Sequence, residues 1–185
     1  PPYESGSLLL EATAGCTHHR CKFCTLYDEL PFHFRLSPLE DIEADLAEAQ
    51  ELLRGQLVQR VFLVGANPFA LQTERLKAIA GRIRKYFPEC RTIGCFARVT
   101  DVGRKTDEAL RELRRLGYGR PDHRRGEGYD PALHFMDKGY QRGTSWSRRT
   151  GWTRRASPIT FSIWPESPGP DAERRRPWPA RRCSI

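Results

Sequence analysis

Aliphatic side chains are scarce in the last third of the sequence. Residues 119–185 contain only 4 leucine, isoleucine or valine residues, whereas residues 1–118 contain 26. A segment with so few aliphatic groups cannot bury enough apolar surface to offset the entropy lost when its backbone becomes ordered. We therefore expect one partial domain in residues 1–118, and a basic tail rich in arginine, proline and tryptophan, poorly ordered, in residues 141–185.

Long apolar runs are also lacking. No run approaches the roughly 18 residues that a membrane-spanning helix needs, so no membrane partner is expected. The length of 185 residues is short for a closed (β/α)₈ barrel, which takes about 250 residues. The net charge of +8 is uneven, because residues 119–185 hold 14 basic and 7 acidic side chains, while residues 1–118 hold 17 and 16.

Strand-like and helix-like segments alternate through the first 118 residues. Three apolar runs predict strands, at residues 7–13, 60–64 and 92–97. Apolar residues at 3–4 spacing predict three helices, which end near Gly55, Tyr86 and Gly117. The expected N-caps are Ser37 (with Pro38 in the first turn), Thr73, and Thr106 or Asp107.

This order predicts an α/β fold with a parallel sheet and helical crossovers. The loops that follow the carboxyl ends of parallel strands converge on the binding site. Three segments follow the predicted strands in this way, namely Cys16–Cys24, Gly65–Pro68 and Arg98–Thr100. We expect them to share one rim.

The first of these loops carries three cysteines in nine residues, spaced C-x₄-C-x₂-C at Cys16, Cys21 and Cys24. Three thiolates on one loop can hold three irons of a [4Fe–4S] cluster and leave the fourth iron without a protein ligand. The alternative is zinc, held by the three cysteines and by His18 or His19. The spacing favours iron–sulfur, because no second C-x₂-C pair and no downstream histidine pair closes a zinc finger. Cysteines grouped in this way indicate a metal site in a reducing compartment, the cytoplasm.

The surrounding sequence reads Thr-Ala-Gly-Cys-Thr-His-His-Arg-Cys-Lys-Phe-Cys-Thr-Leu-Tyr over residues 13–27, between a predicted strand and a long predicted helix. This stretch resembles the start of a radical S-adenosylmethionine (SAM) core domain, in the branch with four residues between the first two cysteines. The family has an aromatic residue before the third cysteine, where this chain has Phe23. The resemblance implies a partial (β/α) barrel of the TIM type, with about three βα units.

The resemblance also implies cofactors and their binding residues. A [4Fe–4S] cluster held by the three cysteines would bind SAM, and an electron from a donor such as flavodoxin or ferredoxin would then generate a 5′-deoxyadenosyl radical. Phe23 would lie against the adenine, and Gly65 and Asn67 would meet the methionine amino group. Arg98 would pair with the methionine carboxylate, for which a guanidinium is well shaped. The substrate cannot be read from the sequence. Cys90 and Cys95 lack ligand spacing and are expected to be structural.

The family pattern breaks after Gly119, where the resemblance implies a fourth strand ending in an acidic residue that contacts the ribose. The chain instead has Arg-Pro-Asp-His-Arg-Arg-Gly-Glu at residues 120–127, and only Glu127 stands near the expected place. Codons for residues 121–127 can be chosen that, read one base later, encode Leu-Thr-Ile-Gly-Val-Glu. We therefore interpret residues 119–140 as a disrupted continuation of the core, and the tail from residue 141 as out of frame. Sequencing the gene would test this.

A second interpretation is a zinc-containing protein that binds nucleic acid through its basic tail. Arginines such as Arg174–Arg176, with tryptophans nearby, could neutralise phosphates and stack on bases. Charge runs are more often solvated, and no RNA-binding motif accompanies this one. The enzyme interpretation is therefore preferred.

Overall fold

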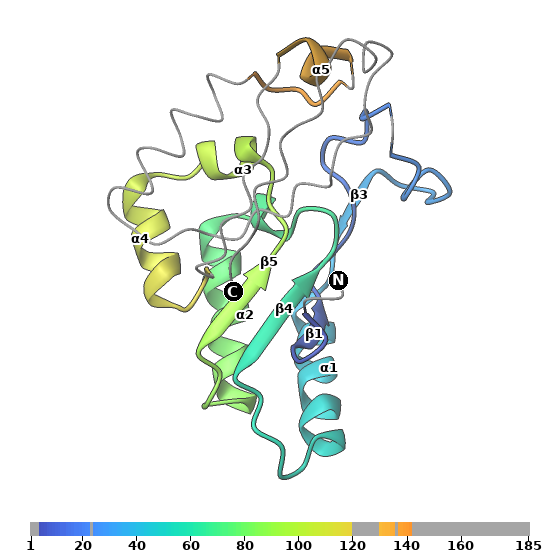
Figure 1. The fold of residues 1–185 in the computed structure, drawn as a ribbon. Helices are drawn as coiled ribbons and strands as arrows, with labels where there is room; N and C mark the ends of the chain where they lie inside the picture. The colour runs from blue at the N-terminus through green and yellow to red at the C-terminus, as the bar shows by residue number, and fades with distance from the viewer. Residues whose placement is uncertain (1–3, 23, 120–129, 136, 142–185) are drawn as a thin grey trace, which may run out of the picture.

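Three parallel strands form the centre of the protein in a computed structural model, which describes residues 4–22, 24–119, 130–135 and 137–141. The strands are β1 (Leu8–Glu11), β4 (Arg60–Val64) and β5 (Thr92–Cys95), in the spatial order β1-β4-β5. Leu8 is in register with Val61, and Val61 with Ile93. Figure 1 shows the strands running in one direction, with α1 and α2 beside the sheet. The predicted parallel α/β arrangement is therefore present in the described residues.

The prediction of a single strand over residues 7–13 is wrong in one respect, because Ala12 separates two strands. Beyond β1 the chain leaves the parallel sheet and forms β2 (Thr13–Gly15), which pairs antiparallel with β3 (Phe34–Leu36). Gly15 has φ +76°, and a Cβ there would lie 2.9 Å from the His33 carbonyl carbon. The two-stranded ribbon holds the start and the end of the cysteine loop together, and sequence periodicity did not predict β3.

The helices α1 (Leu39–Leu52), α2 (Thr73–Tyr86) and α4 (Asp107–Arg115) occupy the predicted segments. Two of the N-cap predictions are wrong. Ser37 does not cap α1, because Pro38 holds the cap position and the Ser37 hydroxyl donates to Glu11. Thr73 is the first residue of α2 and not its cap. Thr106 does cap α4, since its hydroxyl accepts from the Ala109 N–H at 3.2 Å.

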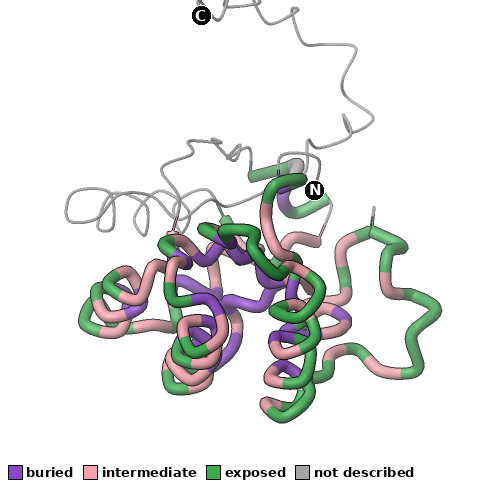
Figure 2. The backbone as a smooth tube through the Cα atoms, turned by 90° about the horizontal axis from the view of Figure 1, so that it is seen from below, coloured by how far each residue is buried: buried purple, intermediate pink, exposed green. Residues whose placement is uncertain are grey.

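The core lies between the sheet and the helices, as the buried backbone at the centre of Figure 2 shows. It contains the predicted apolar faces, namely Ile42 and Leu46 of α1, Leu76, Ile79, Ala80 and Ile83 of α2, and Leu110 and Leu113 of α4. Cys95 is buried in β5 and Cys90 is buried in the preceding loop, as expected of structural cysteines. On the other face of β4, the rings of Phe62 and Phe96 meet edge to face with 5.1 Å between centroids. Helix periodicity therefore identified eight of the 22 buried core residues among those described, and the three predicted strand segments contain seven more.

Further short elements gather where the strands end. They are η2 (Pro68–Ala70), α3 (Val99–Gly103) and α5 (Asp130–Phe135). In Figure 1, α3 and α5 lie beyond the tips of the β4 and β5 arrows. None of the helices among the described residues is both long and apolar enough to span a bilayer.

The sheet in the described part of the chain has three strands and is not closed into a barrel. Beside β5, Tyr118 forms an isolated parallel bridge with Ile93, and Gly119 N–H donates to the Ile93 carbonyl at 3.2 Å. This is the position at which a fourth parallel strand would begin. The expected fourth strand itself, residues 120–127, and the tail from residue 142 onward lie outside the described residues.

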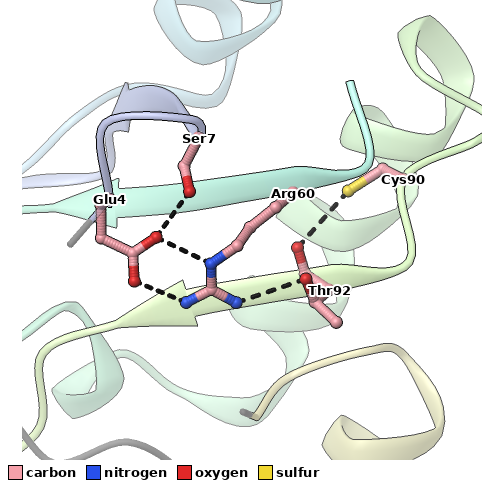
Figure 3. Close-up of polar contacts among 5 residues, drawn as sticks. All are labelled: Glu4, Ser7, Arg60, Cys90 and Thr92. Atoms are coloured by element: carbon pink, nitrogen blue, oxygen red, sulfur yellow. Dashed lines mark hydrogen bonds and ion pairs between the residues drawn. The ribbon is translucent and has the colours of Figure 1, made fainter. Parts of the chain in front are cut away.

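A buried ion pair joins the start of the chain to the amino ends of the strands (Figure 3). The Arg60 guanidinium donates to both carboxylate oxygens of Glu4 at 2.7 Å, and also to the Thr92 hydroxyl at 3.3 Å. The Ser7 hydroxyl donates to the same carboxylate at 2.5 Å. Glu4 is 2% exposed, so the pair is largely removed from water. The contacts fix residues 4–7 against β4 and β5 at the end of the sheet opposite the cysteine loop.

We expect Glu4→Gln to lower the free energy of unfolding by about 2 kcal/mol, because it leaves the buried Arg60 charge without its counter-ion. Chemical denaturation followed by circular dichroism measures the change. The control is Glu51→Gln, because the Glu51–Arg54 pair is exposed at the carboxyl end of α1 and contributes little. Equal stability of the two variants would show that burial does not strengthen the Glu4 contact.

Candidate functional site

The three loops that follow the strands meet in one pocket of about 190 Å³. This volume is below the 300 Å³ or so at which small-molecule pockets usually start, so the pocket encloses only part of a ligand. All three predicted loops contribute to its wall. The lining residues are Cys16, Cys21, Cys24, Leu26, Tyr27, Gly65, Ala66, Phe96, Ala97, Arg98, Val99, Lys138 and Tyr140. Loops far apart in the sequence thus share one rim, as the parallel alternation predicted.

The cysteine loop begins where β2 ends, at Gly15. The Cys16 N–H donates to the His33 carbonyl at 2.7 Å, which anchors the first cysteine on the β2–β3 ribbon. The Cys24 N–H donates to the Cys21 carbonyl at 3.0 Å, which closes a turn between the second and third cysteines. All three thiols are free; Cys16 and Cys21 are half-buried, and Cys24 is exposed.

The electrostatics of the pocket connect the three thiols with two cationic side chains. Burial raises the pKa of the Cys21 thiol, and the neighbouring Cys16 and Cys24 sulfurs raise it further. The positive charges of Lys138 and Arg98 lower the pKa of the same thiol. Three sulfurs and two cations are therefore close enough to influence each other, and the cations offset only part of the cost that burial and the neighbouring sulfurs impose on a Cys21 thiolate.

The donor set of this pocket suits an iron–sulfur cluster, whose irons take cysteine thiolates as ligands. Among the residues described, no group of three or more histidine, cysteine, aspartate or glutamate side chains is already placed around an ion. The thiols therefore share the pocket without being gathered at ligand distance. The residues therefore fit a cluster in their donor chemistry and in their common location. To hold one, the loop would have to bring its sulfurs closer together.

The two histidines of the loop make contacts away from the pocket wall. The His18 ring contacts the Asp137 carbonyl through Nε2 at 2.5 Å, and the His19 ring contacts Asp28 through Nε2 at 3.3 Å. His19 also meets His33 edge to face, with 4.7 Å between ring centroids. Neither ring lines the pocket of the three cysteines. Both contacts use Nε2, so the Nδ1 nitrogen of either ring could still bind zinc, but the ring would first have to move to the pocket wall.

Gly65 lies where β4 ends, and its backbone forms part of the pocket wall. Its φ of +125° is a conformation that residues with a side chain rarely adopt. A Cβ at this position would lie 2.5 Å from the Thr13 carbonyl oxygen and would also collide with the Thr13 hydroxyl. Glycine therefore allows the β4 loop to pass directly against β2, the strand that leads into the cysteine loop.

Asn67 lies behind the pocket and does not line it. The side chain is completely buried, and both ends of its amide are bonded within the protein. Its Nδ2 group donates to the Thr17 hydroxyl at 2.5 Å and to Asp101 at 3.1 Å, while Oδ1 accepts from the Thr17 N–H at 3.3 Å. In this structure the amide contacts the protein on all sides, whereas the sequence predicted contact with a cofactor.

Arg98 is half-buried and lines the pocket at the start of α3. Its guanidinium donates to the Lys138 carbonyl at 2.6 Å, and its backbone N–H donates to Asp101 at 2.9 Å. A guanidinium has five N–H donors, so one bond to a carbonyl leaves donors for an anionic ligand. Arg98 therefore stands where the sequence predicted a cation, opposite the cysteine loop.

The segment from α5 to Gln141 lies over the cysteine loop. The Asp137 carbonyl contacts the His18 ring, and the Lys138 carbonyl accepts from Arg98. The Lys22 ammonium lies 5.5 Å from the centre of the Phe135 ring. A second pocket of about 820 Å³ lies between this segment and Lys22, and shares Tyr140 with the cysteine pocket. The second pocket has the volume of a small-molecule site, which the smaller one lacks.

The structure thus brings together Cys16, Cys21, Cys24, Gly65 and Arg98 in one wall, and Asn67 directly behind it. Phe23 and Glu127 lie outside the described residues. Sequence reasoning missed Tyr27, Lys138 and Tyr140, and also the buried Asp101. No pattern marks Asp101, because it belongs to a short helix that was predicted as a loop.

No protein-family model matches this chain, and no curated protein matches it at a significant level.

Proposed function

We propose that this chain is part of a radical SAM enzyme that binds a [4Fe–4S] cluster and S-adenosylmethionine at the carboxyl ends of its strands. One observation carries the proposal. Three free thiols from a single C-x₄-C-x₂-C loop line the same pocket as Gly65 and Arg98, which come from two other loops. Three thiolates leave one iron of such a cluster without a protein ligand, and this vacancy is what a chelating cofactor requires.

The residues of the pocket have separate roles in this proposal. Cys16, Cys21 and Cys24 hold the cluster, which when bound supplies one electron for cleavage of the cofactor. Gly65 lets the backbone come close to the methionine end of SAM, and Arg98 pairs with its carboxylate. The segment 137–141 covers the pocket beside Arg98 and limits the access of water.

The fold supports the same proposal at a coarser level. A (β/α) barrel of the TIM type holds its active site at the carboxyl ends of its strands, and the pocket lies there. We propose that the three-stranded sheet, with the bridge at Tyr118, is the first part of such a barrel. The reducing partner would be a one-electron donor such as flavodoxin or ferredoxin.

Anaerobic reconstitution with iron and sulfide tests the function. We expect a brown protein that absorbs at about 400 nm, as cysteine-ligated clusters do, with close to four irons for each chain. Adding SAM to the reduced protein should change its electron paramagnetic resonance spectrum, because the cofactor occupies the vacant iron. Stoichiometric zinc that resists replacement by iron would contradict the proposal and would favour the zinc protein instead.

A further inference from the structure

Buried polar side chains connect the cysteine loop to the loop that carries Arg98. Asn67, at the end of β4, makes two hydrogen bonds to Thr17, the residue directly after Cys16. A third bond joins the same amide to Asp101 of α3. Two loops separated by more than seventy positions of sequence are thus joined through one fully buried amide.

The orientation of the Asn67 amide is fixed by its partners. Oδ1 must face Thr17 N–H, because a backbone donor requires an acceptor, and Nδ2 must face the Asp101 carboxylate. The amide therefore works in one orientation only. It bonds to both the backbone N–H and the hydroxyl of Thr17, and so limits the movement of the adjacent Cys16.

Asp101 extends the connection to Arg98. A single oxygen, Oδ2, accepts from Asn67 Nδ2 at 3.1 Å and from the Arg98 backbone N–H at 2.9 Å. The other oxygen, Oδ1, is buried and has no hydrogen-bond partner in the described part of the chain. Capping of α3 accounts for the bond to Arg98, but not for the bond to Asn67 or for a carboxylate that is 1% exposed with one oxygen unpaired, which is costly.

We propose that Asn67 and Asp101 are positioning residues, which set the first cysteine and Arg98 at a fixed separation across the pocket. This inference rests on the proposed function, since it assigns the two buried side chains to the geometry of the cluster and its cofactor. Asn67 then acts through Cys16, and touches no cofactor itself. Cys16 and Arg98 both line the pocket, while the residues that connect them do not.

The test compares the alkylation rate of Cys16 in the metal-free protein with that of Cys24, by mass spectrometry at a single pH. Asn67→Ala and Asp101→Ala should raise the Cys16 rate about tenfold, the change expected when one or two hydrogen bonds no longer oppose local opening. Asp101→Asn should behave like wild type, because an amide oxygen at the Oδ2 position keeps both bonds and its NH₂ group replaces the unpaired oxygen.

Two further variants separate positioning from general loss of stability. Thr17→Val changes an exposed residue, removes one of its two bonds to Asn67, and should raise the Cys16 rate by a smaller factor. Glu4→Gln weakens the fold at the far end of the sheet and should leave the ratio of the two rates unchanged. The inference would be overturned if the Cys16 alkylation rate stayed within twofold of wild type in both Thr17→Val and Asn67→Ala. It would also be overturned if Glu4→Gln raised the ratio of the Cys16 rate to the Cys24 rate as much as Asn67→Ala does.

The cluster provides a second measurement. In wild type and Asp101→Asn, SAM should shift the spectrum of the reduced cluster, whereas Asn67→Ala should bind iron but lose that shift. If wild type binds no cluster, the proposed function fails, while the alkylation ratios still decide whether the two side chains hold the loop. If Asn67→Ala responds to SAM as wild type does, the positioning role fails and the proposed function stands.

Discussion

Alanine at Cys16, Cys21 or Cys24 is expected to remove nearly all of the iron that the protein binds after anaerobic reconstitution. Each thiol lines the same pocket, and a cluster that keeps two protein thiolates loses most of its anchorage. Iron and sulfide content, with absorption at about 400 nm, measures the effect. Each variant should fold as wild type does, because the three side chains are half-buried or exposed and lie outside the core.

The control for these variants is Cys90→Ala, which removes a thiol that lies outside the pocket. Cys90 is buried in the loop before β5 and contacts the Thr92 carbonyl at 3.6 Å. The variant should bind as much iron as wild type, with only the small loss of stability that comes from removing a buried sulfur. Full iron content in all three loop variants, or loss of iron in Cys90→Ala, would refute the assignment of the ligands.

The second large effect is expected at Gly65. Gly65→Ala should lower the free energy of unfolding by about 3 kcal/mol, because it combines overpacking with a backbone conformation that alanine avoids. The new Cβ would meet the Thr13 carbonyl, a backbone group that cannot turn aside. The β4 loop would move away from β2, and cluster binding should fall as well. Denaturant unfolding and iron content measure the two consequences.

A matched control is available in α2. Gly81 has no atom within 4 Å of the place its Cβ would occupy, and it lies in the middle of a helix. Gly81→Ala should therefore stabilise the protein by about 0.5–1 kcal/mol through a lower entropy cost of forming the helix. If Gly65→Ala leaves stability unchanged or raises it, as Gly81→Ala is expected to do, the close approach of Gly65 to Thr13 does not control the fold.

Periodicity predicted the parts of this fold that obey a repeating pattern. The strand at residues 60–64 and the buried face of the helix at residues 73–86 appear as expected, because apolar side chains at regular spacing must face one core. The alternation of strands and helices predicted that the three loops share one rim, since parallel strands place their following loops on a common edge.

Other features depend on contacts between segments far apart in sequence. The pairing of β2 with β3 joins the two ends of the cysteine loop, and β3 has only three residues with no alternation to mark it. Ser37 has the sequence of an N-cap, yet its hydroxyl bonds Glu11 of β1 instead. The role of Asn67 depends on Asp101, a partner that local sequence does not identify.

The ion pair between Glu4 and Arg60 has a practical consequence for handling the protein. It holds residues 4–7 against the amino ends of β4 and β5, whereas the cysteine pocket opens at their carboxyl ends. An affinity tag joined before Glu4 would therefore attach the molecule to a resin or an electrode by the face opposite the thiols. Immobilised in that way, the protein would keep the face that carries the three thiols turned toward the solution, where reductants and small molecules could reach it.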